Sequence, residues 1–202
     1  GRDLTSRKVH SLLIDNETGG RLALEHLVAL GHRQIAVIRG PEEMFDSEPR
    51  WAGICAAAEA AGVKLDSKLT FQLPSLVDPT SGFEGGKAIA QKMLNTRRPF
   101  TAVLAFDDLT ALGVVRGLTE AGVRVPDDCS IIGFDDVLPA AVATPGITTI
   151  RQPLVQMGMT AAQWTVEAIG ARTETAQAQL QRAHPELIVR GSTASAPRKR
   201  KA

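Results

Sequence analysis

One pattern recurs along the sequence and constrains the fold more than any other feature. An apolar-periodic helical stretch ends at a glycine, and a short polar link then leads into a run of apolar residues. The glycines with the runs that follow them are Gly31 before 34–38, Gly62 before 69–73 and Gly122 before 129–134. Glycine directly after a helix adopts the left-handed conformation that satisfies the last carbonyl groups.

A fourth helical stretch, 81–94, leads into the apolar run 101–106 without such a glycine. The runs are short and do not alternate with polar residues, which is typical of strands covered on both faces. Helices that alternate with such strands predict an α/β fold, in which a parallel sheet is flanked by helices and the crossovers are right-handed.

The composition is that of a folded chain, since 44% of the 202 residues are hydrophobic and 22% are charged. This balance excludes a disordered, collagen-like or coiled-coil protein. No run approaches the roughly 20 uninterrupted apolar residues that a membrane-spanning helix needs, so we expect no membrane partner.

The net charge of +1 depends on the last residues of the chain. Four of the 23 basic residues lie at 198–201, in a stretch rich in Pro, Ser and Ala, and the other 19 stand against 22 acidic residues. We therefore predict a basic, disordered tail over 194–202, and no basic surface for nucleic acid on the rest of the chain.

Two acidic pairs follow two of the predicted strands. Asp107 and Asp108 come after one apolar run, and Asp135 and Asp136 come after the next. Because ligands of open α/β sheets bind beyond the carboxyl ends of the strands, these pairs indicate a binding site. We interpret Asp108 as a helix N-cap and Asp136 as a turn residue, which leaves Asp107 and Asp135 without a local role.

Paired carboxylates at strand ends also suit Mg²⁺, which keeps an enzyme hypothesis open. However, the phosphate-binding motifs GxxxxGK[ST] and GxGxxG, the nucleophile motif GxSxG and the zinc-binding motif HExxH are absent from the sequence. The four histidines are scattered, and no Cys or carboxylate stands at metal-ligand spacing from them. The residues therefore favour a module that binds a small molecule, without enzyme activity, cofactor or metal.

Seven segments resemble one known family in their order and spacing. They are 14–20 (IDNETGG), 25–40 (EHLVALGHRQIAVIRG), 50–53 (RWAG), 105–113 (AFDDLTALG), 125–136 (VPDDCSIIGFDD), 145–152 (PGITTIRQ) and 186–193 (ELIVRGST). Together they cover nearly the whole chain. On these segments the sequence resembles the lac repressor (LacI/GalR) family of transcriptional regulators.

The resemblance implies a type I periplasmic-binding-protein-like effector domain of two subdomains, fused in the family to a helix-turn-helix and acting as a cytoplasmic homodimer. Mapped onto this chain, the C-terminal subdomain is 15–150 with 187–193, and the incomplete N-terminal subdomain is 1–14 with 154–184. The helix-turn-helix is absent from these residues, so we expect operator DNA to be bound only through a segment outside them. The apolar surfaces of 9–14 and 154–170 are then expected to lack their cover.

The resemblance also implies which residues face the effector. They are Arg50, Asp107, Asp135 and Gln152, with Asp46 and Val77 near two further contact positions. Asp107 stands where the family usually has Asn. Val77 stands where several members have an aromatic residue that stacks on the ligand, so we expect no such stacking on a sugar ring. A structural alternative for Arg50 is a helix-start residue paired with Asp46 or Glu48.

Two functions of different classes suit the resemblance. The first is the effector-sensing and dimerisation part of a transcriptional regulator, with a sugar or a related small molecule as the effector. The second is the substrate-binding component of a sugar transporter with the same fold. The sequences IGFDD at 132–136 and TTIRQ at 148–152 favour the regulator.

Overall fold

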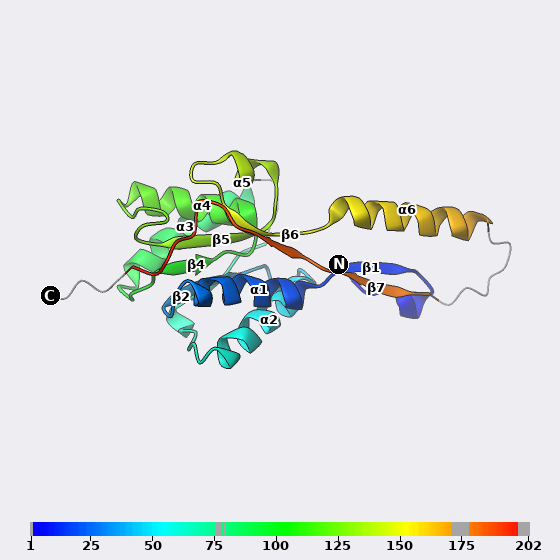
Figure 1. Ribbon diagram of the computed structural model, residues 1–202, viewed down its shortest axis with the longest axis horizontal. Helices are drawn as coiled ribbons and strands as arrows, with labels where there is room; N and C mark the ends of the chain where they lie inside the picture. Colours follow the sequence, from blue (N-terminus) through cyan, green and yellow to red (C-terminus); the bar gives the residue numbers. More distant parts are fainter. Residues whose placement is uncertain (1, 76–77, 79, 171–177, 198–202) are drawn as a thin grey trace.

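The computed structural model describes residues 2–75, 78, 80–170 and 178–197. Its elements in chain order are η1 (Thr5–Arg7), β1 (Ser11–Ile14), α1 (Asn16–Ala29), β2 (Ile35–Arg39), α2 (Ser47–Ala60), η2 (Ser67–Leu69), β3 (Thr70–Gln72), α3 (Ser81–Asn95), β4 (Ala102–Leu104), α4 (Asp108–Glu120), β5 (Ser130–Asp135), α5 (Leu138–Val142), β6 (Thr148–Arg151), α6 (Leu154–Gly170), β7 (Leu180–Ala183) and β8 (Glu186–Ile188). Figure 1 shows an elongated molecule, in which a layered α/β body holds most elements and α6, β1 and β7 extend to one side.

The body is built on a six-stranded sheet in the order β3-β2-β4-β5-β6-β8. Neighbouring strands from β3 to β6 are parallel, and β8 runs antiparallel to β6. The predicted α/β fold with a parallel sheet is confirmed. All carboxyl ends of the parallel strands therefore meet at one edge of the body.

Helices cover both faces of this sheet. On one face, Leu24 of α1 and Ile54 of α2 belong to the same buried cluster as Val37 of β2. On the other face, Met93 of α3 is buried in a second cluster with Ile38 of β2. Val37 and Ile38 are neighbours in one strand and point to opposite faces. Burial on both faces thus explains why the strands read as unbroken apolar runs.

The three glycines of the recurring pattern close helices as predicted. Gly31, Gly62 and Gly122 follow α1, α2 and α4, and their φ angles are +90°, +62° and +81°. These angles lie in the left-handed region, which glycine adopts without the steric cost that a side chain brings.

Two other glycines set the distance between paired helices. A Cβ atom on Gly53 of α2 would lie 1.9 Å from the carbonyl oxygen of Glu17 in α1. A Cβ atom on Gly113 of α4 would lie 2.0 Å from the carbonyl oxygen of Phe83 in α3. The backbones of each helix pair therefore touch at a point where only glycine fits.

A separate two-stranded sheet is formed by β1 and β7, which are parallel, with Ser11 aligned to Leu180. The strand β7 is absent from the elements that the sequence patterns predict. Its sequence, Leu-Gln-Arg-Ala, contains no buried apolar run, and Leu180 is 42% exposed. No sequence pattern therefore predicts a strand at these residues.

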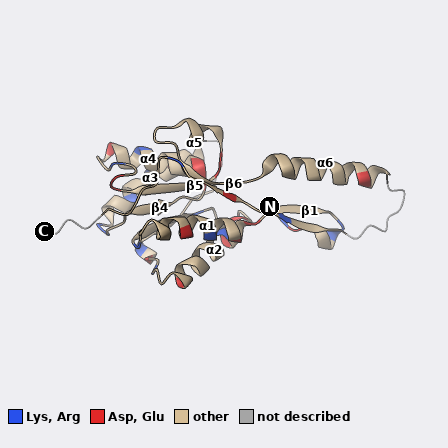
Figure 2. Cartoon of the chain, viewed as in Figure 1, with Lys and Arg blue, Asp and Glu red and all other residues tan. Residues whose placement is uncertain are grey.

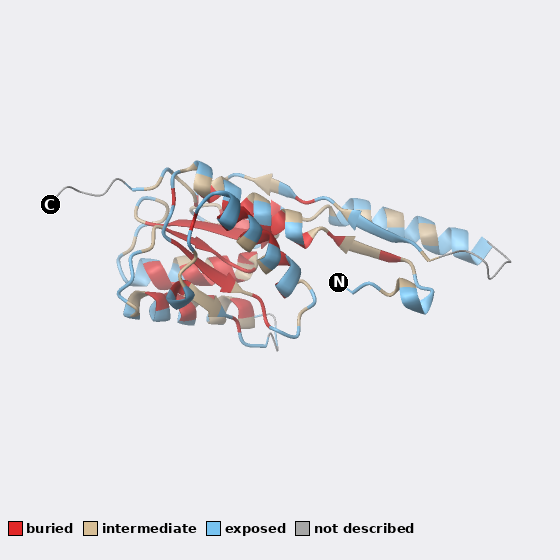
Figure 3. Ribbon diagram, turned by 90° about the horizontal axis from the view of Figure 1, so that it is seen from below, coloured by how far each residue is buried: buried red, intermediate tan, exposed pale blue. Residues whose placement is uncertain are grey.

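The helix α6 has the bounds of the predicted helical stretch 154–170 and contains no buried residue. Val155, Val166 and Ile169 are 80%, 70% and 80% exposed. Figure 3 shows α6 in the colours of exposed and intermediate residues, and Figure 2 shows it almost free of charged residues. The uncovered apolar surface expected on 154–170 is therefore present, whereas in 9–14 Val9 is 48% exposed but Ile14 only 6%.

The prediction of a disordered tail from residue 194 is wrong for 194–197. The amide of Ala194 donates to Oγ of Ser130 at 3.0 Å, and the amide of Ala196 donates to the carbonyl of Leu30 at 2.8 Å. These backbone hydrogen bonds hold the segment on the body. Residues 198–202, which hold the basic part of that tail, lie outside the described residues.

Within the described ranges, no helix has the length and apolar character that crossing a membrane requires.

Candidate functional site

The predicted site residues lie at the edge of the body where the parallel strands end. Asp46 and Arg50 follow β2 and lie at the start of α2, and Asp107 follows β4. Asp135 is the last residue of β5, and Gln152 comes directly after β6. The parallel topology thus brings residues from four separate loops to one edge of the sheet.

Arg50 is the most buried of these residues, with 4% of its surface exposed. Its Nε and Nη2 atoms donate to Oδ1 of Asn16 at 3.2 Å and 2.9 Å, and its Nη1 donates to the carbonyl oxygen of Phe106. The guanidinium carbon lies 3.4 Å from the ring centroid of Phe134 and 4.4 Å from that of Phe106. Two aromatic faces and three hydrogen bonds therefore fix the guanidinium in one place.

The charge of Arg50 is balanced by carboxylates. Burial lowers the pKa of Arg50 to about 10, whereas the nearby charges of Asp135, Asp46 and Asp107 act in the opposite direction. The side chain therefore remains a cation at neutral pH, in surroundings with little water.

Asn16 connects Arg50 to Asp46, because its Nδ2 donates to Oδ1 of Asp46 at 3.0 Å while its Oδ1 accepts from Arg50. Glu48 instead forms an ion pair with Arg39 at 2.6 Å. The structural alternative that paired Arg50 with Glu48 is therefore wrong. The one that paired it with Asp46 is correct to the extent that Asn16 bridges the two side chains.

The prediction that Asp108 is the helix N-cap is wrong. Asp107, not Asp108, is the N-cap of α4, and its Oδ1 accepts from the amide of Thr110 at 2.7 Å. Asp108 is fully buried, where it accepts from the hydroxyl of Thr149 at 2.6 Å and from the amide of Val137 at 2.9 Å. Burial raises the pKa of Asp108 to about 6. Asp108 therefore holds β6 and the start of α5 against α4, and does not face the site.

Asp135 and Gln152 are joined across the edge of the sheet, where Nε2 of Gln152 donates to Oδ1 of Asp135 at 2.5 Å. Burial raises the pKa of Asp135 to about 6, while the Arg50 charge and the Gln152 hydrogen bond act to lower it. Asp135 also has a φ of +111°, a conformation that costs free energy for a residue other than glycine. Such strain is concentrated at functional sites.

Asp136 has a structural role. It accepts from Nε of Arg151 at 2.6 Å and from Nη2 of Arg190 at 2.5 Å. Burial alone would raise the pKa of Asp136, but the hydrogen bonds from Arg190 and Arg151 outweigh it and the pKa is lowered. Its φ of +62° agrees with the turn residue that was predicted.

Asp107, Asp108, Asp135 and Asp136 therefore have different hydrogen-bond partners. Across the described part of the chain, no three His, Cys, Asp or Glu residues form a group that could hold a metal ion.

Five of the six predicted residues, all but Val77, lie in one region of the edge, and Val77 lies outside the described residues. The prediction missed Asn16, which contacts both Arg50 and Asp46, and the aromatic pair around Arg50. One signal could have identified Asn16. It is a polar residue that follows β1 almost directly, as Asp107 follows β4.

Comparison with known proteins agrees with this architecture. Residues 24–193 match the family model of the periplasmic binding protein-like domain. The regulator DegA of Bacillus subtilis is 36% identical over 182 residues, which are 90% of this chain and 51% of DegA. The repressor PurR of Escherichia coli O1:K1 is 38% identical over 186 residues, which are 92% of this chain and 52% of PurR.

Two solved structures are also similar. The complex of the transcriptional regulator CelR with cellobiose has a TM-score of 0.81 and 34% identity, over 91% of this chain and 54% of CelR. A LacI family regulator from Enterococcus faecium with bound ribose has a TM-score of 0.80 and 31% identity, over 96% of this chain and 68% of that one.

The fold and the edge site thus define a periplasmic-binding-protein-like domain. The chain belongs to the LacI family of transcriptional regulators. It spans about half the length of the curated relatives it matches. Because these relatives are regulators, the comparisons do not favour the transporter alternative.

Proposed function

We propose that this chain is the effector-sensing part of a transcriptional regulator and binds a neutral sugar or a related polyol. The observation that carries this proposal is the fixed, buried guanidinium of Arg50 among the carboxylates of Asp46, Asp107 and Asp135, at the edge where ligands of parallel sheets bind. Gln152 adds an amide, which both donates and accepts hydrogen bonds.

The charges at the site support a neutral ligand. One cation faces three carboxylates, so the site is negative when all are ionised. Such a site repels a phosphate or carboxylate group. The adjacent hydroxyls of a polyol can donate to the carboxylates and accept from Arg50 or Gln152, which matches both kinds of partner.

We also propose that the effector lies between two subdomains, divided at the boundaries that the family resemblance implies. The chain crosses from one sheet to the other at three places, namely at Asp15, at 152–153 and at 184–185. Gln152 of the site lies at one of these crossings. A ligand on Arg50 and Asp135 would therefore sit beside the connections on which one subdomain moves relative to the other.

The bound sugars of two relatives provide the first probes, since CelR is seen with cellobiose and the Enterococcus faecium regulator with ribose. The test is a thermal-shift panel of ribose, cellobiose, glucose 6-phosphate and adenine on this chain. A neutral sugar at 100 times its Kd should raise Tm by roughly 5 °C or more. A panel in which the neutral sugars have no effect would contradict the proposal.

We further propose that the regulator is a cytoplasmic homodimer without enzyme activity, and that it reaches operator DNA through a segment outside these residues. Leu138 and Val142 of α5 are 74% and 71% exposed on the body, and a second copy would cover them. Sedimentation velocity should show a dimer that the double variant Leu138→Glu/Val142→Glu dissociates. The control is Val155→Glu/Ile169→Glu on α6. Dissociation by the α6 variant alone would contradict the use of α5.

A further inference from the structure

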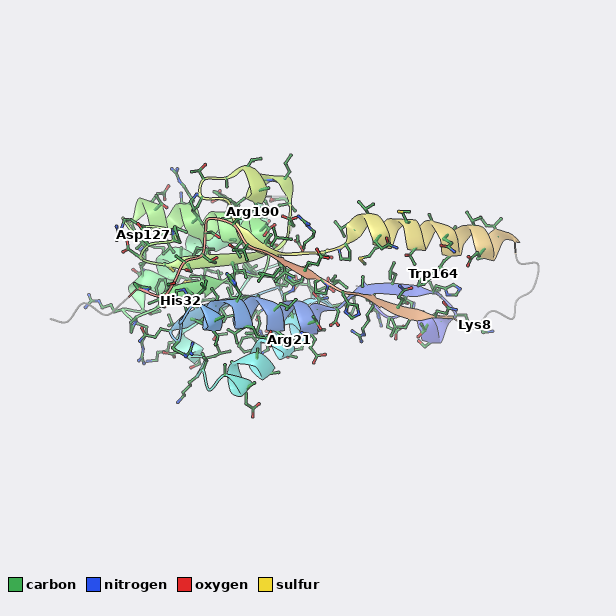
Figure 4. The ribbon with its side chains drawn as sticks, viewed as in Figure 1. Lys8, Arg21, His32, Asp127, Trp164 and Arg190 are labelled. Carbon is green, nitrogen blue, oxygen red and sulfur yellow. The ribbon has the colours of Figure 1, made fainter. Side chains whose placement is uncertain are left out.

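A cavity of about 540 Å³ lies at the opposite edge of the same sheet from Arg50 and Asp135. It is lined by the links that lead into β2, β3 and β4, so it lies at the amino ends of these strands. Figure 4 shows His32, the residue before the lining residue Arg33, at the end of the body far from Trp164 of α6. The volume lies within the range of about 300–1,000 Å³ that is usual for small-molecule sites.

Each of the three links contributes a cation to this cavity, namely Arg33, Lys64 and Arg98. Among the ten lining residues the one acid is Asp66, and its carboxylate already has partners. It accepts from the amide of Lys68 at 2.9 Å and lies 3.8 Å from Nε of Arg98.

The side chain of Arg33 is held at the rim of the cavity. Its Nη1 donates to the carbonyls of His32 and Val28 at 2.8 Å and 3.0 Å. Within the described ranges, neither Arg33 nor Lys64 forms an ion pair. Two cations of a body that is otherwise slightly acidic are therefore available to an anion.

The floor of the cavity is apolar. Ile35 and Leu69 line it but are each only 3% exposed, so the apolar surface that a ligand can reach belongs to Leu65 and Pro99. A free phosphate ion would fill only the charged rim and leave this floor in contact with water. The cavity instead suits a molecule with both an anionic group and a flat, weakly polar ring.

We propose that this cavity is a second ligand site, which takes a phosphorylated small molecule with a planar ring, the chemistry of a mononucleotide. The phosphate lies between Arg33 and Lys64, and the ring covers Leu65 and Pro99. The site is independent of Arg50 and Asp135, because the five residues of β2 place the two edges about 16 Å apart.

The test is isothermal titration calorimetry of this chain with AMP as the probe, and with inorganic phosphate and adenosine as its two halves. AMP should bind about tenfold more tightly than either half, and its affinity should fall with added salt. The double variant Arg33→Gln/Lys64→Gln and the single variant Lys64→Glu should each weaken AMP binding about tenfold or more. Circular dichroism checks that both variants are folded.

Two controls distinguish binding in this cavity from binding elsewhere on the chain. Lys87→Gln/Arg116→Gln removes the same charge from α3 and α4, and it should leave the AMP affinity unchanged. Asp135→Asn alters the sugar site and should also leave it unchanged. The proposal is overturned if AMP does not bind, if it binds no better than phosphate, if the Arg33 and Lys64 variants bind it as tightly as the original chain, or if either control weakens it equally.

Discussion

The side-chain amide of Gln152 donates to Oδ1 of Asp135 at 2.5 Å. This hydrogen bond joins the end of β5 to the residue at which the chain leaves the six-stranded sheet after β6. Asp135 also interacts with the charge of Arg50. The Gln152–Asp135 hydrogen bond therefore connects the most buried cation of the site to the segment where the chain crosses from one sheet to the other. A ligand that accepted or donated a hydrogen bond at Asp135 would compete with Gln152 at this connection.

Asp108 should contribute to stability more than any exposed acid. Asp108→Ala removes the acceptor for Thr149 and Val137 in a fully buried place, and we expect the free energy of unfolding to fall by about 2–4 kcal/mol. The control is Asp127→Ala, since the side chain of Asp127 is 63% exposed, and it should change stability by less than about 0.5 kcal/mol. Equal urea midpoints for the two variants would show that Asp108 does not hold β6 and α5 as described.

Stability should depend on pH through Asp135. Its pKa of about 6 in the folded chain lies above the ordinary value near 4, so the folded state binds more protons than the unfolded state between these pH values. The contribution of Asp135 to stability therefore decreases as pH rises from about 4 to 6. Asp108 acts in the same direction, while the lowered pKa values of His26 and His32 make stability fall as pH drops below about 6.5.

The variant Asp135→Asn separates these contributions. From pH 5 to pH 7.5, the original chain should lose about 1.4 kcal/mol of unfolding free energy relative to the variant. Urea unfolding at the two pH values measures the difference. A constant difference between the two proteins would mean that Asp135 titrates as an ordinary surface carboxyl.

The close helix contacts should not tolerate a methyl group. Gly53→Ala and Gly113→Ala place a Cβ about 2 Å from a backbone carbonyl oxygen, and each should lower the unfolding free energy by about 3 kcal/mol. Gly158 of α6 has no atom within 4 Å of the corresponding Cβ position. Gly158→Ala should therefore leave the stability of the body unchanged and slightly increase helicity. Thermal unfolding followed by circular dichroism compares the three.

Arg50 should support the fold as well as the ligand. Arg50→Ala removes a buried cation from among Asp135, Asp46 and Asp107, and we expect a loss of about 3–5 kcal/mol in unfolding free energy. Arg50→Lys keeps the charge but cannot make the paired hydrogen bonds to Asn16, so its loss should be smaller. If Arg50→Ala unfolds at the same urea concentration as the original chain, the buried cluster is not structural.

The body of the fold could be predicted because its strands and helix ends depend on residues that are close together in the sequence. The apolar run of β2 is unbroken because the strand is buried on both faces. Gly31 stands where α1 ends because that position needs a positive φ. β7 could not be predicted in this way, because a short strand without an apolar run is defined by its pairing with β1.

In the candidate site, too, some residues could be predicted from their place in the sequence and others could not. Asp135 and Gln152 could be placed at the edge because each stands at the end of a strand. The N-cap was assigned one residue too late, because Asp107 and Asp108 are chemically equivalent at a helix start. Asn16 was missed although it follows β1 almost directly, because its partner Arg50 is 34 residues away in the sequence and is brought to it by the packing of α1 on α2.

The most direct test of the effector site is calorimetry of the original chain and of Asp135→Ala with the neutral sugar that gives the largest thermal shift, ribose or cellobiose. The control is Asp127→Ala, which removes the same charge from the surface. We expect Asp135→Ala to bind the sugar about 10–100-fold more weakly, the scale of one charged hydrogen bond, and the control to bind it as the original chain does. Equal affinity of Asp135→Ala and the original chain would contradict the placement of the effector at this edge of the sheet.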